Sequence, residues 1–75
     1  MKPETIVATT FNRDEDHIDD RSSPETIEEW DSLGHITLMI ELEAAYSVSF
    51  SPDEALGLTS VGAIKSALSA HHVTW

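Results

Sequence analysis

The 75-residue sequence contains no cysteine, so neither a disulfide nor a thiolate metal site can stabilise its fold. It has only four lysine and arginine residues against fourteen acidic ones, which gives a formal net charge of −10. A surface of that charge repels nucleic acids and anionic lipids and attracts basic protein surfaces. No apolar run approaches the length of a membrane span, and no basic segment precedes an apolar one at the N-terminus. We therefore expect no nucleic-acid or membrane partner, no signal peptide and a cytoplasmic protein.

Helical patterns account for most of the apolar residues, and no segment has the pattern of a strand. We predict a single all-α domain over residues 1–75, a small four-helix bundle with a long loop between helices 1 and 2 and a short helix 3. The predicted helices are Pro3–Phe11, Leu33–Tyr46 with Asp31 or Ser32 as its cap, a short helix from the capping box Ser51–Glu54 to about Gly57, and a helix that begins at Thr59 or Ser60. Residues 70–75 are predicted to be a frayed tail.

The segment between the first two helices, Asn12–Asp31, is polar and holds nine of the fourteen acidic residues. Charge of this density is typical of a solvated loop, although loops of this length are uncommon unless they are functional or disordered. Its isolated apolar residues, Ile18 and Ile27, are predicted to attach it to the core. Ser23-Pro24-Glu25 can start a single helical turn within it.

The helix predicted over Leu33–Tyr46 has two apolar stripes instead of one. At about 100° per residue, one stripe contains Leu38, Met39, Leu42 and Tyr46, and the roughly opposite stripe contains Leu33, Ile36 and Ile40. One stripe is enough to pack the helix into a bundle this small. The second is expected to meet the long loop, a ligand or a partner protein.

Residues 29–35 read Glu-Trp-Asp-Ser-Leu-Gly-His, and this segment resembles the Asp-Ser-Leu modification motif of the acyl carrier protein family. The resemblance extends over nearly the whole chain. It includes Ile18–Ser23 in the loop, Leu42–Tyr46 at the end of the second helix, Phe50–Glu54 at the start of the third and Thr59–Val61 at the entry to the fourth. The tripeptide alone is a weak signal, but matching helices at matching spacing on both sides make it a strong one.

The resemblance implies that Ser32 is the attachment site of 4'-phosphopantetheine, transferred from coenzyme A by a phosphopantetheinyl transferase. Asp31 is then its acidic neighbour, and the thiol of the arm holds an acyl group as a thioester. A hydroxyl at a helix N-terminus suits this role, because the unpaired amides and the positive end of the dipole there favour a phosphodiester. The plainer alternative is that Ser32 only caps the helix.

The resemblance also implies a non-catalytic monomer that is served by partner enzymes. Leu33, Ile36, Ile40 and Glu43 fall where the family contacts its partners, such as an acyltransferase, a ketosynthase or an acyl ligase. Gly34, Thr37 and Ala44 stand where the most acidic, fatty-acid-synthesis type has acids. That departure favours polyketide or other secondary-metabolite biosynthesis over fatty acid biosynthesis.

Three alternatives are weighed against this interpretation. A serine hydrolase that uses Ser32 and His35 is rejected, because Trp30 replaces the first glycine of the nucleophile elbow and no strand precedes it. His35 is instead predicted to pack or hydrogen-bond in the first turn, and no metal site is predicted from the dispersed histidines and carboxylates. A peptidyl or aminoacyl carrier would use the same serine and arm. An unmodified helical interaction domain would keep the fold and lose the modification.

Overall fold

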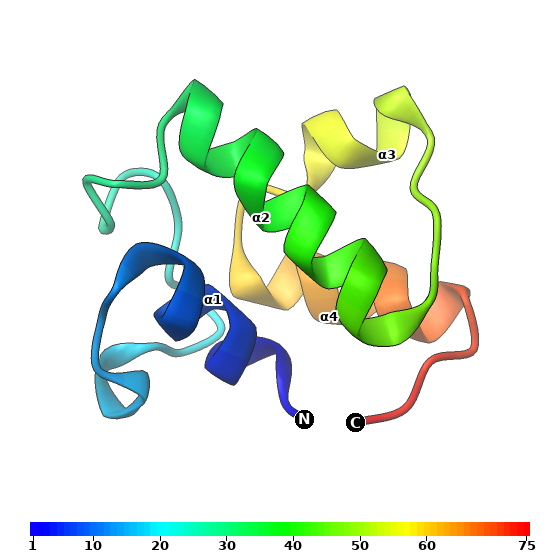
Figure 1. Cartoon of the computed structure of the whole chain (residues 1–75), viewed down its shortest axis with the longest axis horizontal. Helices are drawn as coiled ribbons and strands as arrows, with labels where there is room; N and C mark the ends of the chain where they lie inside the picture. Colours follow the sequence, from blue (N-terminus) through cyan, green and yellow to red (C-terminus); the bar gives the residue numbers. More distant parts are fainter.

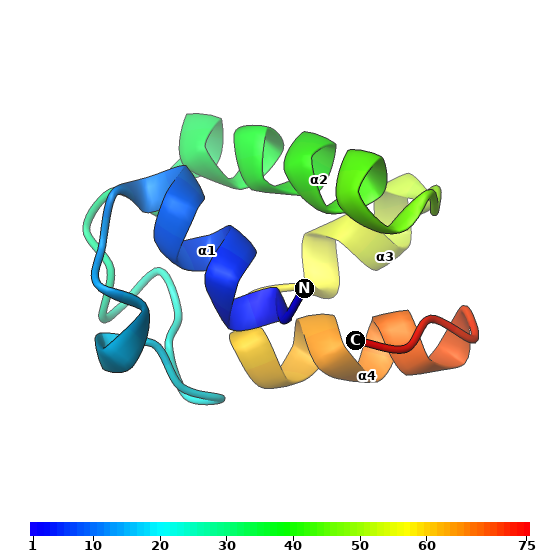
Figure 2. The same cartoon turned by 60° about the horizontal axis from the view of Figure 1, so that its bottom comes forward.

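A computed structural model describes all residues, 1–75, and contains four α-helices and no strand (Figure 1). The helices are α1 (Pro3–Phe11), α2 (Ser32–Tyr46), α3 (Pro52–Gly57) and α4 (Val61–Ala70), with one 3₁₀ turn, η1 (Glu15–His17), between α1 and α2. Figure 2 shows α2 and α4 on opposite sides of the molecule, with α1 and α3 between them. None of the helices combines the length and the apolar composition that a membrane crossing requires. The predicted all-α class, the four helices, the long loop and the short third helix are confirmed.

Three of the four helices begin where the sequence supplies a side-chain cap, and α1 begins instead at Pro3 without one. Asp31 caps α2, because its Oδ1 accepts a hydrogen bond from the Gly34 amide at 2.8 Å. The capping box before α3 is complete: the Glu54 amide donates to Ser51 Oγ, and the Ser51 amide donates to the Glu54 carboxylate. Ser60 caps α4. These local hydrogen bonds explain why the predicted starts are confirmed to within a residue.

The predicted core stripe of α2 faces the inside of the bundle. Leu38, Met39 and Leu42 are buried, and Tyr46 packs against the core with part of its ring exposed. They meet the apolar faces of α1 and α4, whose buried residues are Ile6, Val7, Ala8, Phe11, Val61, Ile64 and Leu68. One continuous cluster therefore joins α1, α2 and α4, while no side chain of α3 is buried.

The long loop is attached to the bundle as predicted, and by further contacts that its sequence does not indicate. Ile18 and Ile27 are buried. Ser23 also begins one helical turn, since its carbonyl accepts from the Ile27 amide at 2.9 Å. In addition, the carbonyls of Asp20 and Ser22 accept from the first amides of α4 at 2.9 and 3.0 Å. The loop is thus hydrogen-bonded to the helix that lies last in the sequence.

The second stripe of α2 is exposed, because the loop does not cover it. The exposed fractions are 77% for Leu33, 57% for Ile36 and 59% for Ile40. Figures 1 and 2 show the loop beside α1, at the opposite end of the molecule from α3. The alternative that the loop buries this stripe is therefore wrong.

The C-terminal tail is more structured than predicted. Residues 70–75 were expected to fray, but Ala70 is helical and the Val73 amide donates to the Leu68 carbonyl at 2.9 Å. His71 contacts the edge of the Phe50 ring and lies 2.8 Å from a carboxylate oxygen of Glu54. The expectation is corrected as far as Val73, since these contacts tie the segment to the bundle and leave only the last two residues beyond the final hydrogen bond.

Most of the few basic residues are used within the chain. Three of the four form ion pairs: Lys2 with Glu15, Arg13 with Glu29, and Lys65 with both Glu4 and Asp20. The Lys65 pairs join α4, α1 and the loop at 2.7 Å each, and hydrogen bonds to Asp20 and Glu4 raise the pKa of the Lys65 ammonium. The outward-facing charge is therefore almost entirely negative.

We expect Leu42→Ala to destabilise the domain by about 2–5 kcal/mol, because it leaves a cavity in the core. Ile40→Ala, on the exposed stripe of the same helix, is expected to change stability by less than about 0.5 kcal/mol. Urea unfolding followed by circular dichroism measures both. A large loss for Ile40→Ala would show that this side chain belongs to the core.

Acid is expected to weaken the fold. Hydrogen bonds from Thr5 and Lys2 lower the pKa of Glu15, and a hydrogen bond from Arg13 lowers that of Glu29, relative to the ordinary value of 4.5. Because each pKa is lower in the folded state than in the unfolded state, the stabilisation is complete above 4.5 and is lost as pH falls through the folded values. The urea concentration at half-unfolding should therefore decrease when the pH is lowered below 4.5. The decrease should be smaller in Glu29→Gln. An equal fall in both proteins would exclude the Arg13–Glu29 pair as a source.

Candidate modification site at the start of helix α2

The segment before α2 is anchored by the indole of Trp30, which is only 1% exposed. The ring stacks on Phe11 at a centroid distance of 5.6 Å and an interplanar angle of 27°. Its other neighbour is the imidazole of His35, which lies nearly parallel to it at 6.3 Å. A large apolar ring thus fixes the residue that directly precedes the Asp31 cap.

Gly34 lets this segment approach the helix closely. A β-carbon at position 34 would overlap the Glu29 carbonyl oxygen and would lie 2.9 Å from Cε1 of Phe11. The only residue type without a β-carbon is therefore needed in the first turn of α2. The sequence interpretation treated Gly34 as a position that lacks a family acid, and this packing requirement was missed.

His35 uses both ring nitrogens. Nδ1 accepts a hydrogen bond from Trp30 Nε1 at 2.9 Å, so the proton lies on Nε2, which donates to the Ala55 carbonyl oxygen of α3 at 2.7 Å. The prediction that His35 packs or hydrogen-bonds in the first turn is confirmed. With Nδ1 occupied, the imidazole has no free lone pair with which to deprotonate Ser32, and the arrangement lacks the base of a hydrolase.

Ser32 and Leu33 stand apart from this anchored frame. Both are exposed, and the Ser32 hydroxyl forms no hydrogen bond within the protein. Ser32 is the first residue of α2, and Asp31 has taken the capping role that was the plainer explanation for the serine. The frame therefore presents a hydroxyl to solvent at a helix N-terminus without giving it a structural task.

The predicted partner-binding residues lie on one side of α2, in the turns that follow Ser32. Leu33, Ile36 and Ile40 project from the surface, and Leu56 of α3 adds a fourth apolar side chain that is 76% exposed. Leu56 was missed, because the sequence of a six-residue helix does not show whether its one leucine faces the core or the solvent. Glu43 is half-buried and accepts a hydrogen bond from the Phe50 amide at 2.8 Å, so this carboxylate has an internal partner as well.

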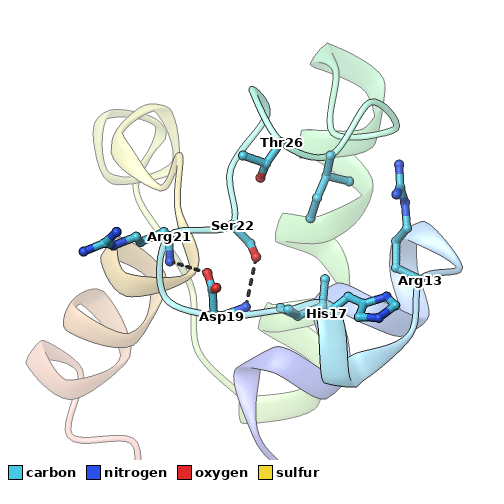
Figure 3. A pocket seen from close by; sticks show the side chains of 8 residues that line it. Arg13, His17, Asp19, Arg21, Ser22 and Thr26 are labelled. Atoms are coloured by element: carbon cyan, nitrogen blue, oxygen red, sulfur yellow. Dashed lines mark hydrogen bonds between the residues drawn. The ribbon is translucent and has the colours of Figure 1, made fainter.

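One surface cavity lies elsewhere, in the loop. It has a volume of about 230 Å³ and is lined mostly by polar side chains, among them Arg13, Asp19, Arg21 and Ser22 (Figure 3). Hydrogen bonds from the Asp19 amide to Ser22 Oγ and from the Arg21 amide to Asp19 Oδ1 shape its wall. Figure 3 shows the two guanidinium groups directed away from each other, so they do not converge on a ligand. No group of three histidine or acidic side chains is placed to hold a metal ion.

We expect Gly34→Ala to destabilise the domain by about 1–3 kcal/mol, because the methyl group must displace the loop carbonyl or the Phe11 ring. Gly57→Ala is the matched control, since a β-carbon there meets no atom within 4 Å. Thermal unfolding of the two variants measures the difference. Equal melting temperatures would show that the close approach at Gly34 costs nothing to relieve.

No protein-family model matches the sequence, and no curated protein matches it. The carrier interpretation therefore rests on the resemblance of the motif at residues 29–35 and of the segments on both sides of it, together with the geometry around Ser32.

Proposed function

We propose that this protein is an acyl carrier protein whose Ser32 hydroxyl receives 4'-phosphopantetheine from coenzyme A. One observation carries the proposal. In the segment 29–35, every side chain is engaged in holding the turn, or is absent as at Gly34, except those of Ser32 and Leu33. A turn held this firmly around one free hydroxyl suits a site that an external enzyme must recognise and modify.

The attachment is a phosphodiester exchange. The Ser32 oxygen forms a bond to the phosphorus that carries the pantetheine arm, the pyrophosphate bond of coenzyme A breaks, and the nucleotide part leaves while the hydroxyl proton passes to a base of the transferase. The amides of Ser32 and Leu33 have no partner within the chain, and they lie at the positive end of the α2 dipole. Both features stabilise a phosphodiester at this position.

The chemistry after attachment belongs to partner enzymes. The arm would hold acyl cargo as a thioester and keep it near each active site, which raises its effective concentration without any new contact. Because His35 Nδ1 accepts from Trp30, this imidazole does not serve Ser32 as a base, and the proposal assigns catalysis to the partner enzymes.

The partners are expected to be basic proteins with an apolar contact area. Leu33, Ile36, Ile40 and Leu56 provide the apolar part of the surface, and the net charge of −10 provides long-range attraction to a basic surface. A phosphopantetheinyl transferase would come first, followed by an acyltransferase, a ketosynthase or an acyl ligase. Polyketide or other secondary-metabolite biosynthesis is the setting that the sequence favours.

A second candidate is an unmodified helical interaction domain. The exposed stripe of α2, together with Leu56 of α3, favours it equally, because four large apolar side chains in contact with water are typical of a protein-binding surface whether or not Ser32 is modified. The two candidates differ in whether the Ser32 oxygen is bonded to phosphopantetheine.

The test is the intact mass of the purified protein after incubation with coenzyme A, magnesium and a broad-specificity phosphopantetheinyl transferase. We expect a gain of one phosphopantetheine, mapped to Ser32. Ser32→Ala should show no gain and should keep the circular dichroism spectrum of the native protein, since this hydroxyl forms no internal hydrogen bond. Ser66→Ala is the matched control, because it removes another exposed helical serine and should leave the gain intact.

Two results would contradict the proposal. Modification of Ser32→Ala would place the attachment elsewhere. No gain in the folded native protein, with this transferase and with that of its own host, would leave the interaction domain as the function.

A further inference from the structure

We propose that His35 is a positioning residue: its hydrogen bond to the Ala55 carbonyl fixes α3, and with it Leu56, relative to Ser32, so that one partner enzyme can contact both. This inference rests on the proposed function, because it assigns a role in recognition by the enzymes that act on Ser32.

Helix α3 has few attachments of its own. It is six residues long and contains no buried side chain. The capping box of Ser51 and Glu54 stabilises its start but does not connect it to another helix. The buried side chains of Phe50 and Leu58 hold the segments before and after it. Within the helix, Ala55 makes the connection to α2.

Two short hydrogen bonds make this connection rigid. Trp30 is fixed in the core by Phe11, and its indole N–H ends on His35 Nδ1 at 2.9 Å. The opposite ring nitrogen donates to Ala55 O at 2.7 Å. That carbonyl lies in the last turn of α3, where it also accepts a hydrogen bond from the Leu58 amide at 3.2 Å, and its second lone pair is available to His35. Ala55 also packs against the edge of the core, and the hydrogen-bonded link between α3 and the start of α2 passes through the His35 imidazole.

The connected residues are direct neighbours of exposed apolar ones. His35 is followed by Ile36, and Ala55 is followed by Leu56. The His35–Ala55 bond therefore sets the spacing between the α2 stripe and the one large apolar side chain that α3 exposes. His71, at the end of α4, contacts Glu54 at 2.8 Å, so α3 is held from a second side by a bond that does not involve α2. Loss of the His35 bond is then expected to displace α3 without releasing it.

Two substitutions separate the contributions of the two His35 hydrogen bonds, the one from Trp30 and the one to Ala55. His35→Gln keeps a nitrogen donor near the position of Nε2, whereas His35→Asn keeps an acceptor near Nδ1 and cannot reach Ala55. His72→Asn is the matched control, because His72 is exposed and in the left-handed region that asparagine tolerates. The readouts are KM and kcat of the phosphopantetheinyl transferase for each carrier, hydrogen exchange of the α3 amides, and the melting temperature.

We expect His35→Asn to raise KM about fivefold, because the net contribution of one hydrogen bond corresponds to about that factor in an equilibrium constant. The value of kcat should change by less than about twofold. His35→Asn should also speed exchange of the α3 amides. His35→Gln should keep KM and α3 exchange close to the native values, although it lowers the melting temperature because the buried Trp30 N–H loses its acceptor. His72→Asn should stay close to the native protein in all three readouts. The proposal is overturned if His35→Asn leaves KM and α3 exchange unchanged, or if KM follows the melting temperature equally in both His35 variants.

Leu56→Ala supplies a test that does not depend on whether a His35 variant folds, because its side chain lies outside the core. It should raise KM, and in the double variant with His35→Asn the two effects should not add, since both remove the same contact. Full additivity would contradict a shared route. If the native protein is never loaded, the proposed function fails, and the His35–α3 link is then judged from amide exchange alone.

Discussion

The arrangement around Ser32 depends on the burial of one indole ring. Trp30 brings the end of an otherwise polar loop into the core, and its N–H must find an acceptor there because an unpaired buried donor is costly. His35 supplies that acceptor and in doing so is committed to one tautomer. The close approach of Gly34 to Phe11 and the hydrogen bond from His35 to α3 both lie against this ring or its partners.

The charged residues fall into two groups, those in ion pairs that connect parts of the fold and the acidic residues that remain at the surface. Three of the four basic residues form ion pairs with acids in the region of the loop, α1 and α4. These pairs stabilise the packing of the loop on the helices. The surface that remains is acidic, and on α2 and α3 it carries exposed apolar side chains. Such a surface discourages self-association through like charge, and this is the physical basis for proposing a basic partner.

The helices were predictable because their signals are local: Asp31, Ser51 and Ser60 each cap the helix that follows them. The two stripes of α2 were predictable from period alone, but which neighbours they meet was not, since the course of a twenty-residue loop depends on tertiary contacts. The same limit applies to the bridge from Trp30 through His35 to Ala55, whose ends lie far apart in the sequence. The carrier motif indicated Ser32, and only the geometry indicated why Gly34 and His35 stand beside it.

The freedom of the Ser32 side chain has a practical consequence in a chain without cysteine. A Ser32→Cys substitution would create the single thiol of the molecule, at an exposed position whose side chain forms no hydrogen bond within the protein. A maleimide-linked arm of any chosen length could then be installed there alone, with a thioether in place of the serine phosphodiester of the proposed function. Stable mimics of different cargoes could be displayed on one unchanged scaffold, so that the chemistry of the arm and the shape of the protein are varied separately.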